Sequence, residues 1–421
     1  MPTVDGTNGS ESSSWSSRPF RWTFGALTVS MLGSQITALA VPLLAALTLH
    51  ATPIEMGVLG AASLLPTFVV SLAAGVFVDR VRRKRRLMIA MDIVRAVLLL
   101  LIPAAVVVGQ LSLPLLYAVV FAVGTATVIH ELTQNAFIPA VVAKPQLLDA
   151  NAKLQMSYSI GESAGPGVGG LLVQIINAPL AVVANAVSYL ASGALLARAR
   201  STSTPDLSRA PHPVAEVKEG LRALLADPLL GPWVRWGSVS VVFMGAFEAQ
   251  YVLFASRDLS LSPAWIGVIA AAGGLGAVPA ALLITRLERT VPVGKTIVVG
   301  LMGYFAFLLA VPATHGPQPL VVATLVLAKI AQTLTFTISN VQQWSLRQLT
   351  TSPQLLGRVA AGNRFLIGAA ETAGALTSGI AVELLGARPS LALCGVLGIL
   401  ALAPLIRRPL WSLKRLPTHP A

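Results

Sequence analysis

Long stretches without a charged residue constrain this chain more than any other feature of its sequence. The segments from Trp22 to Leu49, from Met56 to Val78 and from Ala96 to Ile129 contain no Asp, Glu, Lys or Arg. Because the hydrocarbon core of a bilayer is about 30 Å thick, roughly 20 apolar residues let a helix cross it. The pattern therefore predicts several membrane-spanning helices, with the lipid bilayer as the main partner of the chain.

The composition supports this interpretation and argues against a nucleic-acid partner. Of the 421 residues, 55% are hydrophobic and only 11% are charged, whereas a soluble domain usually has about 25% charged residues. The net charge of +13 would suit nucleic acid, but only 6% of the residues are aromatic. No basic helix face interleaves with aromatic residues that could stack on bases, so we expect no nucleic-acid binding.

Few residues in the sequence suggest catalysis or metal binding. Cys394 is the only cysteine, and the five histidines are scattered without ligand spacing. A disulfide within the chain is thereby excluded, and neither a metal site nor a cofactor is predicted. The sequence has no recognisable catalytic triad or phosphate-binding loop. We therefore expect a protein that is not an enzyme, and we assign no catalytic residue.

Turn-forming residues divide the longest apolar runs into pairs of helices. Three of these runs are interrupted, at residues 109–114, 177–179 and 315–317, and each is interpreted as a hairpin of two spans. Adding the single spans brings the predicted total to twelve.

Lys and Arg concentrate in alternate loops of this arrangement. Six of the seven residues from Arg80 to Arg86 are basic. Further Lys and Arg residues gather around positions 198–235, 286–295, 341–358 and 407–415. Positively charged loops stay on the cytoplasmic side, where they face anionic lipid headgroups. We predict a multi-pass protein of the plasma (inner) membrane with both termini in the cytoplasm.

The sequence also repeats itself at about half its length. GVLGAA from Gly57 matches GVIAAA from Gly267, and ESAG from Glu162 matches ETAG from Glu371. Internal repeats of this kind are common in secondary transporters. The predicted fold is therefore all-α, with twelve transmembrane helices in two pseudo-symmetric six-helix halves. The predicted domains are a disordered tail over residues 1–17, a first half over 18–198, a cytoplasmic linker over 199–231, a second half over 232–407 and a cytoplasmic tail over 408–421.

Within the linker, residues 214–227 have the pattern of an amphipathic helix. Their sequence, VAEVKEGLRALLAD, places apolar residues at helical spacing with charged residues opposite. Two interpretations stay open. The helix either lies on the cytoplasmic membrane surface or caps the helical bundle.

Two motifs carry a resemblance to a known family. GVFVDRVRRKRR, residues 75–86, resembles the loop 2–3 motif of the major facilitator superfamily, and GESAGPGVGG, residues 161–170, resembles the span 5 motif of its antiporters. Flanking stretches such as SLLPTFVV and NAFIPAVV are similar to the branch that holds macrolide-efflux and enterobactin-exporter proteins. The matching positions are Gly75, Asp79, Arg80, Arg83 and Lys84 in the first motif, and Gly161, Gly165, Pro166, Gly169 and Gly170 in the second.

The resemblance covers nearly all of residues 20–405, with some departures. Arg82 and Ala152 stand where the family usually has glycine, and Val120 stands near the place of its span 4 arginine. The resemblance also implies that Asp79 packs near Gly357 and Arg358, at the start of the eleventh span.

The resemblance implies a function as well as a fold. It implies a monomeric exporter of a small amphiphilic or hydrophobic compound, such as a drug, an antibiotic, a siderophore or another secondary metabolite. Export would proceed by proton antiport with alternating access. Two alternatives stay open: an importer or symporter with the same fold, and a membrane receptor or scaffold that binds a ligand without moving it.

Ionisable residues inside the spans mark the candidate sites, because each costs roughly 2.5–3.5 kcal/mol at the centre of a membrane helix. Asp92 and Arg95, three residues apart on one helix face, are interpreted as a structural pair; the alternative is that they carry a proton or bind substrate. Glu162 and Glu371 hold repeat-related places. An apolar surrounding favours the protonated form of a carboxyl group, so each is a candidate to carry a proton or bind substrate; the alternative is a structural hydrogen bond.

Glu248 and Lys329 lie in spans that line the central cavity in the family, and both are further proton or substrate candidates. A salt bridge between them is the alternative. Arg364, two helical turns before Glu371, is a candidate to neutralise that carboxylate. His130 and Glu131 close the fourth span, where we expect a structural role at a solvated interface.

Overall fold

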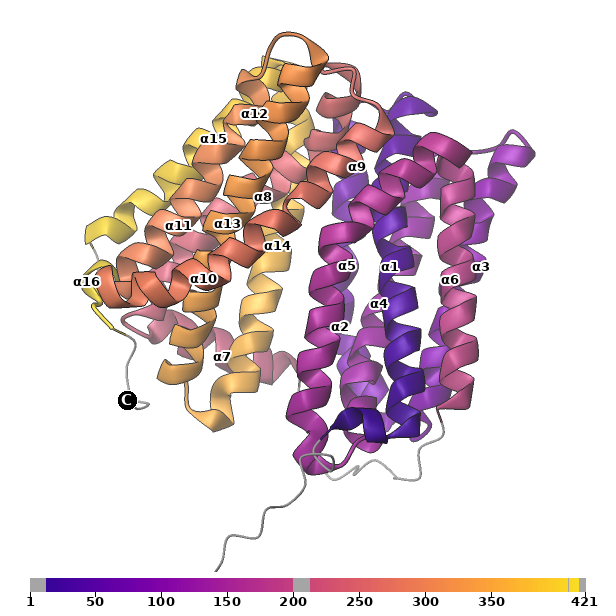
Figure 1. Ribbon diagram of the computed structural model, residues 1–421, viewed down its shortest axis with the longest axis horizontal. Coiled ribbons are helices and arrows are strands. Elements are labelled where there is room, and N and C mark those ends of the chain that lie inside the picture. Colours follow the sequence, from indigo (N-terminus) through magenta and orange to yellow (C-terminus); the bar gives the residue numbers. More distant parts are fainter. Residues whose placement is uncertain (1–12, 200–212, 408, 416–421) are drawn as a thin grey trace, which may run out of the picture.

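The computed structural model describes residues 13–199, 213–407 and 409–415, and these residues form a bundle of helices without any β-strand (Figure 1). Residues 1–12 of the predicted tail and residues 200–212 of the predicted linker lie outside the described part. The helices of the first half are α1 (Arg18–Leu47), α2 (Pro53–Arg80), α3 (Lys84–Val107), α4 (Leu113–Phe137), α5 (Leu147–Ile176) and α6 (Ala178–Arg198). After α7 (Pro213–Ala226) come α8 (Leu230–Arg257), α9 (Pro263–Ala272), α10 (Gly274–Thr290), α11 (Val293–Leu308), α12 (Ala310–Ala313), α13 (Gln318–Thr350), α14 (Pro353–Leu385), α15 (Ala387–Leu402) and α16 (Pro409–Ser412). Short 3₁₀ helices are η1 (Ser14–Ser16), η2 (Ile138–Ala140), η3 (Lys144–Gln146) and η4 (Ala403–Arg407).

The helix boundaries follow local sequence signals. Helix α2 begins with a capping box, in which the Thr52 side chain accepts from the Glu55 backbone and the Glu55 side chain accepts from the Thr52 backbone. Between α5 and α6, Asn177 adopts a positive φ of 70°, and its side chain accepts from the Leu180 N–H. Gly109 and Gly316 also have positive φ, as glycine allows without strain. The three predicted hairpins therefore turn where their turn formers lie.

Eleven of the helical spans in the described part are long and apolar enough to cross a membrane, with α9–α10 and α11–α12 each counted as one. Helix α5 is the remaining member of the predicted twelve. It does not reach the same apolarity because it is rich in glycine and carries Asp149, Lys153 and Glu162. It nevertheless lies inside the bundle, against α1 and α9. The eleven spans establish a multi-pass membrane protein.

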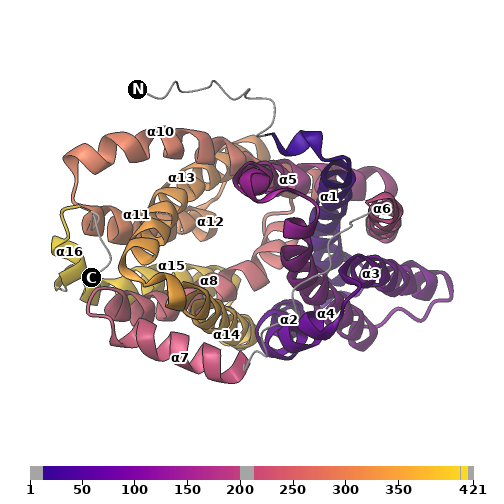
Figure 2. The same ribbon diagram turned by 90° about the horizontal axis from the view of Figure 1, so that it is seen from below.

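The helices gather into two groups, which Figure 2 shows side by side. Helices α1–α6 pack on one another, as do α8–α15, and the main links between the groups run from α2 to α14 and from α5 to α9. In Figure 1 the groups lean together at the top and separate toward the bottom. We call these the closed end and the open end.

The closed end is held by close approach of small residues. A Cβ atom on Gly57 would lie 2.5 Å from the Ala375 carbonyl oxygen, and one on Gly379 would lie 2.4 Å from the Ile54 Cα. Hydrogen bonds add to this packing. The Arg257 guanidinium donates to the Ala46 carbonyl oxygen at 2.8 Å, and the Gln250 amide donates to the Pro53 carbonyl oxygen at 2.9 Å.

Two segments at the open end are docked on the helices. Helix α7 packs on α14, where a Cβ on Gly220 would lie 1.9 Å from the Arg358 carbonyl oxygen. Of the two interpretations of this helix, capping of the bundle is the one that agrees with its contacts. The end of the predicted disordered tail is also docked: the Ser14 N–H donates to Asp149 at 2.7 Å, and the Trp15 ring packs on Phe24. The tail prediction is therefore wrong for residues 13–17, because their contacts with α1 and α5 hold them.

Candidate functional site

The basic run at residues 80–86 binds the ends of helices within its own chain. The buried Lys84 ammonium donates to the Val78 carbonyl oxygen near the end of α2. The Arg85 guanidinium donates to the carbonyl oxygens of Ala197 at 3.1 Å and Ala199 at 3.4 Å, where α6 ends. A cation is stabilising at a helix C-terminus, where carbonyl groups have no partner within the helix. The other basic side chains of the run are exposed: Arg80, Arg82, Arg83 and Arg86.

The loop 2–3 motif does not make the contact that the resemblance implied. Within the described ranges, no ion pair within 4.0 Å joins Asp79 to Arg358; Arg358 instead pairs with Glu219 of α7 at 2.7 Å. A Cβ on Gly75 would meet nothing within 4 Å. The groups separate toward this end (Figure 1), and the ion pair that joins them in the described part of the chain is formed by Glu131 and Arg364 instead. Arg82 does not have positive φ, so the loop turns without the glycine that the family usually has there.

The span 5 motif gives α5 two close-packing faces. A Cβ on Gly161 would lie 2.1 Å from Met31 Cε, and one on Gly165 would lie 2.4 Å from Gln35 Cβ, both on α1. On the other face, a Cβ on Gly170 would lie 2.4 Å from the Pro263 carbonyl oxygen at the start of α9. Gly169 also packs on α1, and the Pro166 carbonyl lies against Gly267. The motif therefore joins the two groups of helices at the closed end.

A cavity with two lobes lies between the groups, and we call it the central cavity. One lobe has an empty volume of about 820 Å³ and the other of about 1150 Å³, and both volumes include space that is open to solvent. Glu248 of α8 lines both lobes. The smaller lobe also has polar side chains from two other helices, namely Gln35 of α1 and Lys329 and Gln332 of α13. The larger lobe is mostly apolar, with residues such as Val41, Met56, Leu59, Leu99 and Val123.

Glu248 and Lys329 thus line one lobe but do not form a salt bridge. No ion pair within 4.0 Å joins them among the residues that the structure describes. The Glu248 side chain is exposed to the cavity, and Lys329 is partly buried. A carboxylate without a protein partner can bind a cation or accept hydrogen bonds from a ligand. An ammonium group without a protein partner can bind an anion or donate hydrogen bonds to a ligand.

The repeat-related carboxylates lie in different surroundings. Glu162 is exposed and lies one helical turn before Pro166, which lines the smaller lobe. Glu371 lines a separate space of about 770 Å³ between α8, α11, α13 and α14, which we call the side cavity. Arg364 does not neutralise Glu371, because its guanidinium lies 3.2 Å from Glu131 of the other group. That interpretation of Arg364 is wrong, since its partner comes from another helix.

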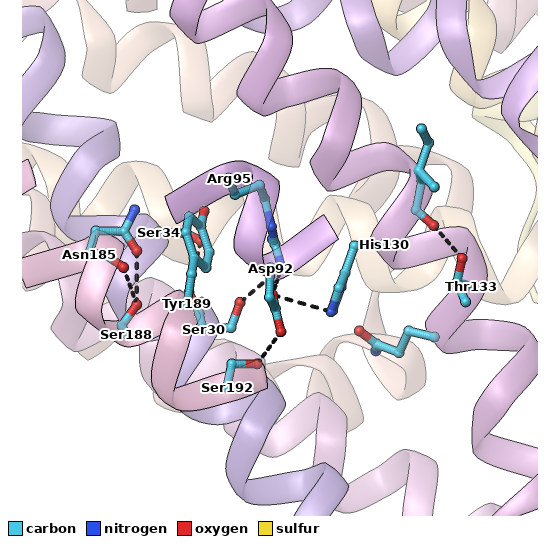
Figure 3. A network of polar contacts seen from close by, with 12 residues as sticks. Ser30, Ser34, Asp92, Arg95, His130, Thr133, Asn185, Ser188, Tyr189 and Ser192 are labelled. Carbon is cyan, nitrogen blue, oxygen red and sulfur yellow. Dashed lines mark hydrogen bonds and ion pairs between the residues drawn. The ribbon is translucent and has the colours of Figure 1, made fainter. Parts of the chain in front are cut away.

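Asp92 and Arg95 form a fully buried polar network inside the first group of helices (Figure 3). The two side chains are paired, and Ser192 donates to the second Asp92 oxygen at 2.8 Å. The Arg95 guanidinium lies 4.1 Å from the centre of the Tyr189 ring, a cation–π contact. These contacts agree with a structural pair.

His130 belongs to this network, which the sequence interpretation missed. Its Nε2 atom lies 3.6 Å from the Asp92 carboxylate, and only 3% of the residue is exposed. The predicted solvated interface is therefore wrong for His130, because α4 turns this side chain toward α3 (Figure 3). The atoms Arg95 Nε and His130 Nε2 have no hydrogen-bond partner in the described part.

The family model described as Major Facilitator Superfamily matches residues 23–343. The enterobactin exporter EntS of Escherichia coli O1:K1 / APEC is 26% identical over 354 residues, which cover 81% of this chain and 79% of that protein. EntS of Shigella flexneri has the same identity and coverage.

Solved structures share the fold at low sequence identity. A bacterial homologue of the human lysosomal transporter Spinster, inward-facing and occupied, has a TM-score of 0.72 at 14% identity, covering 96% of this chain and all of that one (100%). A bacterial homologue of the iron transporter ferroportin, in an inward-facing state, has a TM-score of 0.70 at 14% identity, with 92% and 97% coverage.

Proposed function

The chain belongs to the Major Facilitator Superfamily, and from this premise we propose that it is a secondary active exporter of a small amphiphilic or hydrophobic compound. The observation that carries the proposal is the central cavity. Its larger lobe is mostly apolar and its smaller lobe holds Glu248, Lys329 and two glutamines. Ligand sites of this kind bury an apolar body and orient it with a few polar groups.

Two further observations support export by alternating access. The relatives with 26% identity are named enterobactin exporters. The arrangement, with one closed and one open end, agrees with that of neighbours described as inward-facing. Under our orientation the open end faces the cytoplasm, so a substrate would enter there and leave when the seam between α5 and α9 opens.

We propose proton antiport with Glu248 as the first coupling candidate and Glu162 as the second. A proton can move the equilibrium between two states only if it binds them with different affinity. Glu248 lies where the two lobes meet, so its protonation changes the charge of the site that receives the substrate. A proton taken up on the outside would displace the bound compound, and its release into the cytoplasm would restore the carboxylate.

The test begins with the drug susceptibility of a sensitive host with and without the gene, because resistance identifies both direction and substrate class. The compound found is then followed in proteoliposomes under an imposed pH gradient. We expect Glu248→Gln to retain binding and downhill exchange but to lose uphill efflux. Glu383→Gln is the matched control, since Glu383 is exposed near the closed end of α14. Full gradient-driven efflux in Glu162→Gln, Glu248→Gln and Glu371→Gln would show that the carboxylate mechanism is wrong.

A further inference from the structure

The side cavity differs from the central cavity in its chemistry. Glu371 is the one charged residue in its lining. Three aromatic side chains, Trp233, Phe305 and Phe336, and two asparagines, Asn340 and Asn363, surround the same space. Among the described residues, the side chains of Glu371, Asn340 and Asn363 have neither a hydrogen bond nor an ion pair in the protein. The cavity is therefore lined by polar groups that are available to a ligand.

The cations closest to this cavity in the sequence have other partners. Arg235, which follows Val234 of the lining, is exposed and donates to the Gly231 carbonyl oxygen of its own helix at 3.2 Å. Arg364 pairs with Glu131, and Lys329 lines the central cavity. Arg347 is buried, and its guanidinium stacks on Trp344 at 5.0 Å. With the Gln343 amide oxygen turned toward its donors, Arg347 donates to it at 2.7 Å and the Trp233 indole N–H does so at 2.5 Å. Among the described residues, no Lys, Arg or His side chain therefore lies within ion-pair distance, 4.0 Å, of the Glu371 carboxylate.

We propose that the side cavity binds an organic monocation, such as a protonated amine or an onium ion with apolar substituents, and that Glu371 is its counter-ion. A carboxylate removed from bulk water is stabilised by an opposite charge, and aromatic faces attract cations. The indole N–H of Trp233 is bound to Gln343, so the ring itself remains as part of the cavity lining. A neutral molecule could donate hydrogen bonds to Glu371 but would leave its charge unbalanced, and an anion would be repelled by it.

The position of the side cavity places it on the way to the central cavity. On α14, Asn363, Ile367 and Glu371 follow one another at intervals of one turn along the side cavity, and Ala375, the next turn, lines the central cavity. On α8, Met244 lines the side cavity, and Glu248, one turn later, lines the central one. Both helices begin at the open end. The inference rests here on the proposed function: a cationic substrate meets Glu371 first and Glu248 second.

The test uses radiolabelled tetraphenylphosphonium and the full-length protein, purified in detergent and immobilised. We expect saturable binding to the wild type, an affinity loss of roughly tenfold or more in Glu371→Gln, and retained binding in Glu383→Gln, whose exposed carboxylate lines neither cavity. Tetraphenylborate, an anion of the same shape, serves as the matched probe, and we expect Glu371→Gln not to weaken its binding. Ile367→Trp fills the cavity and leaves the carboxylate in place, so we expect it to weaken binding of the cation as well. This second variant keeps the test valid if Glu371→Gln proves unstable.

The outcomes separate this inference from the proposed function. No binding of the cation to the wild type, or equal binding to the wild type and both side-cavity variants, would overturn the inference. So would a loss of binding in Glu383→Gln as large as that in Glu371→Gln. Gradient-driven efflux that persists in those cases would leave the proposed function standing. Binding that depends on Glu371 without any efflux would support the side cavity and contradict the exporter.

Discussion

At the scale of single residues, the carboxylate of Asp92 has no contact with solvent and depends on Arg95 and Ser192. Removing one partner of a buried pair leaves an uncompensated charge, at a cost of about 3–5 kcal/mol. We therefore expect Asp92→Asn to lower the thermal unfolding temperature of the purified protein by several degrees. The double variant Asp92→Asn with Arg95→Gln should recover much of that loss.

The exposed pair Glu131–Arg364 gives the matched control for this measurement. Both side chains are about half exposed, at 46% and 59%, and exposed pairs contribute only about 0–1 kcal/mol. Glu131→Gln should therefore leave the unfolding temperature nearly unchanged. A double variant at positions 92 and 95 that is no more stable than Asp92→Asn would contradict the interpretation of a mutually compensating pair.

The same residues show what spacing in a sequence can reveal. The pair of Asp92 and Arg95 was predictable because both residues lie on one helix, and a spacing of three residues places two side chains on the same helix face. His130 and Arg364 were assigned wrongly because their partners lie on other helices. Packing decides which helices face each other. The only signal in the sequence for a partner of the Asp92–Arg95 pair was a histidine, His130, at the end of the neighbouring apolar span.

At the scale of helices, the seam between α5 and α9 depends on the absence of side chains. A Cβ on Gly267 would lie 2.6 Å from the Pro166 carbonyl oxygen and 2.9 Å from the Gly170 Cα. We expect Gly267→Val to separate α9 from α5 and to widen the closed end. Spin labels on cysteines at Asn177 and Asp258, in a Cys394→Ser background, would report this as a longer distance.

Gly75→Ala is the control for this experiment, because its Cβ would meet nothing within 4 Å. It should leave the distance between the labels unchanged. An unchanged distance in Gly267→Val would mean that the seam can absorb a side chain and that close packing does not hold it shut.

Helix α7 offers a second prediction at this scale. A Cβ on Gly220 would lie 1.9 Å from the Arg358 carbonyl oxygen, so Gly220→Val cannot keep the present packing on α14. We expect faster amide hydrogen exchange over residues 217–226 in this variant. Glu219→Gln removes only the partly exposed ion pair with Arg358 and should change the exchange much less. Equal exchange in Gly220→Val and the wild type would show that α7 is not docked there.

Sequence patterns predicted most of the helices but left some of their roles open. Hairpins were predictable because glycine, proline and asparagine permit the backbone angles that their turns need. The amphipathic pattern of α7 did not show whether the helix lies on the membrane or on the bundle, because both surfaces can bury the apolar face of a helix. Helix α5 shows the converse: the glycines that let it pack also lower its apolarity.

At the scale of the whole molecule, the orientation in the membrane is a prediction that reporter fusions can check. The Lys and Arg residues concentrate at one end, and such loops stay in the cytoplasm. We expect fusions after Arg415 and within the linker at residue 203 to report a cytoplasmic location. A signal from the opposite side at either place would contradict the twelve-span arrangement.

The two-group architecture followed from the internal repeat, but the conformation did not. Under the alternating access proposed above, the same sequence adopts states that open to either side, so no residue pattern distinguishes one state from the other. The loop 2–3 motif illustrates this: Asp79 and Arg358 could meet only when the open end closes. Contacts that exist in one state alone are therefore beyond a prediction from sequence.

The two ends of the molecule differ in the forces that join them. Small residues and hydrogen bonds join the closed end, whereas Glu131 and Arg364 form the one ion pair between the groups in the described part of the chain. Salt screens exposed charges over about 8 Å at physiological ionic strength but has little effect on close packing. Ionic strength should thus affect the contact between the two groups at the open end but not at the closed end. Salt raised on the open side weakens the attraction that draws that end together, and the same salt on the other side leaves the seam unaffected.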